Sequence, residues 1–154
     1  MQHLLFTHSI LRWAILLFGI WTLLNAITGV FGNRKYSPTD NKINLFFMIG
    51  CDIQLVLGLI LYFNNGWFDM LKNSTKDVMK DAGMRFFAME HFLMMLIVWL
   101  LVHVGRSMVK RADTDAKKHK KSLIYFGIAI LLILAMIPWP FRSTDIARDW
   151  LPKL

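Results

Sequence analysis

Cysteine is almost absent from this sequence, which contains Cys51 and no other. A single cysteine excludes an intrachain disulfide and a thiolate metal cluster. Charge is also scarce: Asp, Glu, Lys and Arg make up 18% of the 154 residues, whereas 56% are hydrophobic. A soluble domain of this length would carry more charge and would interrupt its apolar runs sooner. The composition therefore predicts one integral membrane domain over residues 1–154.

Several functional motifs are missing as well. The sequence has no glycine-rich phosphate-binding loop, no HExxH motif and no Ser/His/Asp set on one side of the membrane. No charged region and small-residue cleavage site flank the first apolar stretch, so we expect it to remain as a helix. The net charge is +8, but basic residues in a membrane protein report topology first, so nucleic-acid binding is not predicted.

Four apolar segments are each long enough to cross a bilayer, at residues 4–31, 43–63, 85–104 and 123–139. A bilayer core requires about 20 residues of helix. Strands are excluded, because isolated strands leave backbone groups unpaired in lipid and these runs show no two-residue alternation. The prediction is an all-α, four-helix membrane bundle. A short surface helix is expected within residues 67–82.

The connections differ in their basic residues. The 31–42 and 106–121 loops hold 10 Lys and Arg, whereas the opposite side holds seven, interleaved with five Asp. The positive-inside rule places the first side in the cytoplasm and both termini on the outer, periplasmic side. Membrane lipids are the expected surroundings, and the 106–121 loop is expected to contact anionic headgroups.

Two histidines interrupt the apolar runs at similar depths. His8 lies about 6 Å into the first segment and His91 about 9 Å into the third, and both segments enter from the outer side. Ionisable groups within a span are costly unless they are paired, ligated or wetted. The pattern predicts one haem b between the helices, with each imidazole as an axial metal ligand. The alternative for each is a hydrogen-bonded histidine near a helix end.

Charged residues accompany both histidines. Arg12 follows His8 by four residues, so both project from one face of the helix. Arg12 needs a partner at its depth, and Glu90 is the candidate, either to position a ligand histidine or a haem propionate, or as a purely structural pair. Arg85 and Arg142 lie nearer the outer interface and are better placed to meet propionates.

Three further polar residues have less specific interpretations. Asp52 lies near the middle of the second segment, where it would serve a proton path or a quinone headgroup, or be neutral and hydrogen-bonded to another helix. His103 is interpreted as an interfacial residue. His119, within a lysine-rich run, is expected in water, so a second bis-histidine haem is not predicted.

The sequence resembles a family of small bacterial four-helix membrane proteins labelled cytochrome b over nearly its whole length. Four short motifs in the first, third and fourth segments carry the resemblance. The motifs are HSILRW at 8–13, RFFAMEHFLMM at 85–95, HVGR at 103–106 and IPWPFR at 137–142. The resemblance implies a haem b protein of the bacterial inner membrane, with His8 and His91 at the matching positions. It carries no established substrate or reaction.

Two classes of function remain open. The first is a one-electron carrier, or a subunit of one, that exchanges electrons with a quinone or a partner protein, with haem supplying the redox chemistry. The second is a non-redox accessory subunit whose buried polar residues lock helices together or dock a larger membrane complex. A carrier or subunit is favoured over an enzyme acting alone. A transporter is disfavoured, because four helices without repeats leave little room for alternating access.

Overall fold

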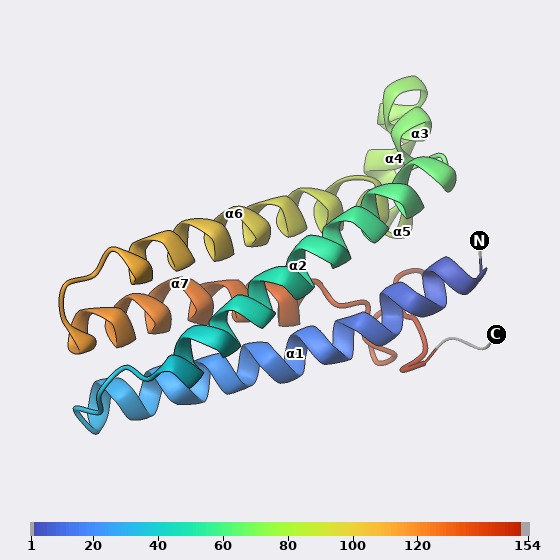
Figure 1. Ribbon diagram of the computed structural model, residues 1–154. Coiled ribbons are helices and arrows are strands. Elements are labelled where there is room, and N and C mark those ends of the chain that lie inside the picture. The colour runs from blue at the N-terminus through green and yellow to red at the C-terminus, as the bar shows by residue number, and fades with distance from the viewer. Residues whose placement is uncertain (1, 152–154) are drawn as a thin grey trace.

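The computed structural model describes residues 2–151, which contain helices and no strands (Figure 1). Lys153, one of the seven basic residues counted on the outer side, lies outside this range. Four helices are long and apolar enough to cross a membrane. They are α1 (Gln2–Phe31), α2 (Pro38–Asn64), the continuous Ala82–Lys110 helix and α7 (Asp115–Met136). The predicted all-α, four-helix arrangement is therefore confirmed.

The Ala82–Lys110 helix is built from three parts. A first turn, α5 (Ala82–Arg85), leads into a π-helical turn, η1 (Phe86–Glu90), and then into α6 (His91–Lys110). Before it, the predicted surface helix is divided at Ser74 into α3 (Trp67–Asn73) and α4 (Thr75–Lys80). In Figure 1 these short helices project beyond the bundle.

The four long helices form a ring in which α1 and α6 lie diagonally opposite. Helix α1 packs against α2 and α7, and α6 packs against the same two helices (Figure 1). Phe47 and Phe126 are fully buried and meet edge to face, with ring centroids 5.9 Å apart. Large apolar side chains also cover the outside of the bundle, including Leu17 and Leu131, which are 62% and 67% exposed. Such an apolar exterior suits contact with membrane lipids.

Helix α2 begins at Pro38 and not at residue 43. Ser37 Oγ accepts a hydrogen bond from the Asp40 amide, and the Asp40 carboxylate accepts one from the Ser37 amide at 2.7 Å. This reciprocal capping box, followed by proline at the first helical position, starts a helix. The second half of the expected 31–42 loop is therefore a helix start, held further by a 2.8 Å ion pair between Arg34 and Asp40.

The basic 106–121 region is mostly helical. This corrects the prediction of a loop there and the prediction that His119 lies in water. Helix α6 continues to Lys110, and α7 starts at Asp115 behind the capping residue Thr114. His103 therefore lies well inside its helix. His119 is not in water, because it is 1% exposed and packs against Gly29 of α1. We call this end of the bundle, where α6 ends and α7 begins, the basic end.

The opposite end, where α1 begins, is called the amino end. Helix α7 stops there at Met136, earlier than residue 139, and residues 137–151 fold back to α1 (Figure 1). The Arg148 amide donates to the Pro138 carbonyl at 3.0 Å. Gly83 of α5 packs closely on Asp145 of the tail, because a Cβ at position 83 would lie 2.9 Å from the Asp145 carbonyl oxygen.

Candidate functional site

His91 is the first residue of α6 and is held in one orientation by α7. Its Nδ1 lies 3.0 Å from the carbonyl oxygen of Met136, the last residue of α7. A carbonyl only accepts, so Nδ1 carries the proton and Nε2 keeps its lone pair. Metal-binding histidines are commonly oriented by such a hydrogen bond from the other ring nitrogen. The His91 imidazole is thus prepared to bind a metal through Nε2.

The π-helical turn η1 stands immediately before His91. The His91 amide donates to the Phe86 carbonyl, five residues earlier. Because this turn is wider than an α-helical one, Arg85 and Glu90 face each other and form a 2.8 Å ion pair. The Tyr62 hydroxyl of α2 donates to the Ala88 carbonyl within the turn at 2.9 Å. Single π turns inside α-helices are frequent at functional sites.

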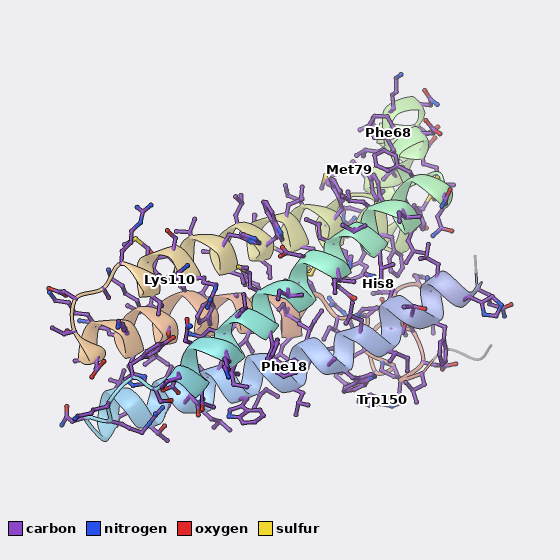
Figure 2. All side chains as sticks on the ribbon, viewed as in Figure 1. His8, Phe18, Phe68, Met79, Lys110 and Trp150 are labelled. Atoms are coloured by element: carbon purple, nitrogen blue, oxygen red, sulfur yellow. The ribbon has the colours of Figure 1, made fainter. Side chains whose placement is uncertain are left out.

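His8 projects from α1 into the space between α1 and α2 (Figure 2). A Cβ added at Gly58 of α2 would lie 3.3 Å from Cε1 of its ring, so the glycine leaves room for the imidazole. Nδ1 of His8 is buried and has no hydrogen-bond partner within residues 2–151. The two predicted metal ligands lie on diagonal helices, His8 near the start of α1 and His91 at the start of α6.

The predicted ion pair between Arg12 and Glu90 is wrong. Arg12 Nη2 donates to the carbonyl oxygen of Trp150 at 2.8 Å, and Glu90 is paired with Arg85. Two features of the fold account for this. Helices α1 and α6 are diagonal, so Arg12 meets the returning tail first, while the π turn delivers Arg85 to Glu90.

The other two predicted propionate partners, Arg85 and Arg142, also lie at the amino end. Arg85 donates to the Met79 carbonyl at 2.9 Å in addition to its pair with Glu90. Arg142 donates to the Ala135 carbonyl at 2.7 Å and lies 5.0 Å from the Phe86 ring centroid. Arg142 thereby satisfies a carbonyl in the last turn of α7, where helical partners are missing.

Three tryptophans cluster at the amino end, a feature that the sequence did not reveal. Trp13 stacks on Trp150 with ring centroids 5.8 Å apart, and Trp139 meets both rings, at 6.2 and 5.6 Å. Trp13 Nε1 also donates to the Trp150 carbonyl at 3.2 Å. The tail is thus tied to α1 by aromatic packing and by two hydrogen bonds, one turn beyond His8.

A second polar cluster links α2 to α6. Asp52 Oδ1 accepts from Trp99 Nε1 at 2.7 Å and lies 3.2 Å from His103 Nε2, while His103 Nδ1 lies 3.0 Å from the Trp99 carbonyl. Both ring nitrogens face oxygen acceptors, so every contact is satisfied when the imidazole carries two protons. The predicted hydrogen bond from Asp52 to another helix is confirmed. His103 is not isolated, because it contacts Asp52 of α2 and the Trp99 carbonyl. The four-residue spacing between Trp99 and His103 could have predicted the second of these contacts.

Comparisons with protein-family models, with curated proteins and with solved structures return no match to this chain. The resemblance to four-helix bacterial proteins labelled cytochrome b therefore stays a prediction.

Proposed function

We propose that this protein spans the bacterial inner membrane, with both termini on the periplasmic side, and binds one haem b through His8 and His91 as a one-electron carrier or carrier subunit. The observation that carries the proposal is the hydrogen bond from His91 Nδ1 to the Met136 carbonyl, 3.0 Å long. It fixes the ring and leaves Nε2 as a free ligand atom in an apolar surrounding.

The residues around His8 are compatible with a bound haem. A buried imidazole nitrogen without a hydrogen-bond partner within residues 2–151 is costly, and a histidine bound to iron has no such deficit. Gly58 keeps the opposing surface of α2 free of side-chain atoms beside the ring. An imidazole on each of two diagonal helices suits a cofactor held at the centre of the bundle.

Haem bound here would supply one-electron redox chemistry, and the chain would supply the binding site. His8 and His91 would hold the haem iron through one imidazole nitrogen each, and two imidazole ligands would give a low-spin centre. Arg85 and Arg142 are the nearby cations for propionates, and each already holds a backbone carbonyl that would compete.

The test is the absorbance spectrum of protein purified from haem-supplied cells. We expect a low-spin Soret band that sharpens with distinct α and β bands on dithionite reduction. His8→Ala and His91→Ala should each abolish the low-spin spectrum. His103→Ala and His3→Ala are matched controls and should retain it. A colourless wild-type protein, or loss of the spectrum only in the controls, would overturn the proposal.

The proposed redox partner is a quinone. Asp52 contacts Trp99 and His103 through Oδ1, so its second carboxylate oxygen can accept a hydrogen bond from a quinol headgroup, and the side chain is 39% exposed at the surface of the bundle. Reduction of the haem by a short-chain quinol should then slow in Asp52→Asn, while reduction by dithionite stays unchanged. An equal quinol rate in the variant would remove the quinone from the proposal.

A non-redox accessory subunit is the second candidate, and the interhelical polar contacts favour it. Asp52, Trp99 and His103 tie α2 to α6, as polar contacts between membrane helices commonly do. In this case the purified protein is colourless, and Asp52→Asn lowers its stability or its retention in a larger complex. The absorbance experiment separates the two candidates directly.

A further inference from the structure

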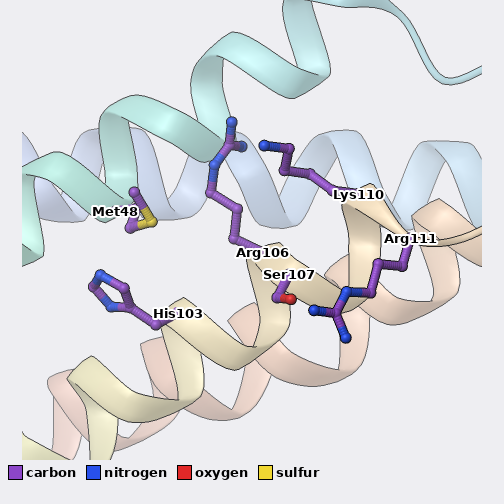
Figure 3. A pocket seen from close by; sticks show the side chains of 6 residues that line it. All are labelled: Met48, His103, Arg106, Ser107, Lys110 and Arg111. Atoms are coloured by element: carbon purple, nitrogen blue, oxygen red, sulfur yellow. The ribbon is translucent and has the colours of Figure 1, made fainter.

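A pocket of about 430 Å³ opens at the basic end of the bundle (Figure 3). One residue of α2 and five of α6 and the turn after it line the pocket: Met48, His103, Arg106, Ser107, Lys110 and Arg111. Three of these carry a fixed positive charge and none is acidic. The pocket therefore concentrates cationic donors without an anion of its own.

Arg106 is the buried member of this set. It is 8% exposed, and its Nη1 donates to the Asn41 carbonyl of α2 at 3.1 Å. No carboxylate within residues 2–151 pairs with it. A buried charge that lacks a counter-ion is strongly unfavourable.

Three acids on neighbouring elements are already engaged. Asp40 pairs with Arg34 at 2.8 Å, Asp52 with His103 at 3.2 Å and Asp113 with Lys117 at 2.9 Å. Asp115, at the start of α7, lines a different pocket with Arg34 and Lys35. A bound anion would supply the negative charge that Arg106 lacks.

Lys110 and Arg111 give the pocket its geometry. Figure 3 shows the ends of the Arg106 and Lys110 side chains pointing toward each other, although both are positive. An anion between them would turn this repulsion into attraction. Guanidinium and ammonium groups together form strong, charge-assisted hydrogen bonds to phosphate oxygens, and the Ser107 hydroxyl adds a neutral donor.

The position of the pocket along the helix suggests the source of the phosphate. The Ala82–Lys110 helix has 29 residues, or about 43 Å, whereas the hydrocarbon core is about 30 Å thick. Its ends therefore extend into the headgroup layers. Arg106 lies one turn before the end of the helix, about 6 Å from it. This is the level of lipid phosphates, and apolar Met48 lies on the side of the pocket toward the core.

We propose that this pocket binds the phosphate group of an anionic phospholipid. The inference rests on the proposed insertion into a bilayer and does not depend on haem. Arg106 and Lys110 hold the phosphate between them, Arg111 adds a positive charge beside Ser107 at the rim (Figure 3), and the acyl chains follow the groove between α2 and α6.

The experiment measures which lipid stays with the protein. Protein reconstituted in vesicles of equal phosphatidylglycerol and phosphatidylcholine is extracted and its bound lipid is counted by native mass spectrometry. The test variant is Lys110→Gln/Arg111→Gln, and the matched control is Lys120→Gln/Lys121→Gln, with the same change in net charge at the same end. Near an anionic surface each basic residue is worth roughly fivefold in affinity. The test variant should therefore lose phosphatidylglycerol preference by roughly 25-fold, and the control, whose lysines lie outside the pocket, should lose clearly less.

Two results would overturn the proposal. One is an equal loss in the test and control variants, which would mean that overall charge and not the pocket selects lipid. The other is displacement of phosphatidylglycerol by excess inorganic phosphate, which would assign the site to a soluble phosphate. A protein absent from the membrane fraction would remove the bilayer on which the inference rests. The absorbance of the same samples reports on haem separately, so failure of one proposal is not mistaken for failure of the other.

Discussion

Gly29 of α1 packs against the His119 ring of α7 at the basic end. The substitution Gly29→Ala tests how much this packing contributes to stability. A Cβ at position 29 would lie 2.2 Å from both Cγ and Nδ1 of His119. Carbon atoms in contact are normally about 3.5–4.0 Å apart, so the overlap is about 1.5 Å. His119 is 1% exposed, and Cγ is fixed close to its own backbone, so the ring cannot turn away freely.

Two opposing effects determine how much Gly29→Ala changes the free energy of unfolding. Alanine is favoured over glycine inside a helix by about 1 kcal/mol. Overpacking a tight core costs typically about 1–3 kcal/mol and occasionally more, and an overlap of this size belongs at the upper end. The net expectation for Gly29→Ala is a loss of roughly 1–2 kcal/mol. For a chain of 154 residues this lowers Tm by several degrees.

The assay is thermal unfolding in detergent, with Gly127→Ala as the control. Gly127 also lies in a long helix, but a Cβ there meets only Leu23 Cδ1, at an ordinary 3.7 Å. Gly127→Ala should therefore raise Tm slightly. In a His119→Ala background, Gly29→Ala should lose most of its cost, because the opposing ring is gone. Equal or higher stability of Gly29→Ala in the wild-type background would refute the buried placement of His119.

Three further predictions concern caps, clusters and pH. Ser37→Ala removes the capping box of α2 and should cost about 1 kcal/mol in chemical unfolding; an unchanged unfolding free energy would count against the observed start of the helix. Asp52→Asn removes the charged acceptor of Trp99 Nε1 and should shift the tryptophan fluorescence and lower stability by about 1–3 kcal/mol, whereas a variant as stable as the wild type would deny the cluster a structural role. Burial raises the pKa of Tyr36 to about 12, whereas the unfolded chain ionises near pH 10. The unfolded state therefore binds fewer protons between these values, so stability should fall as pH rises through this window, and Tyr36→Phe should show a smaller fall.

The architecture was predictable because length and apolarity in a bilayer leave few alternatives. The helix boundaries were less so. Ser37 and Pro38 were placed in the 31–42 loop, although serine before proline is also the start of a capped helix. The 106–121 region was interpreted as a loop from its charge, yet lysine and alanine favour helices. Charge reports contact with water or headgroups, and a helix can continue into either.

The equal depth of His8 and His91 stays a prediction, and the partners around them were not predictable. The depth was calculated from the rise per residue, which needs only the two helix starts. It could not show that α1 and α6 are diagonal, which separates Arg12 from Glu90. Nor could it show the π turn that lets Arg85 pair with Glu90, or the returning tail whose Trp150 carbonyl accepts a hydrogen bond from Arg12. Each of these depends on the order in which helices pack, and a single sequence does not contain that order in any local pattern.

Two imidazoles have buried nitrogens without hydrogen-bond partners within residues 2–151, and the space around them distinguishes their roles. Nε2 of His119 lacks a partner, but its ring is pressed on Gly29, where even a methyl group would overlap it. A Cβ at Gly58 would lie 3.3 Å from the His8 ring, so a methyl group there would press on that ring far less than one at Gly29 would press on His119. A cofactor needs room beside its ligand, and the packing of Gly29 leaves none at His119. Added haem should therefore bind at His8 and leave the packing between His119 and Gly29 unchanged.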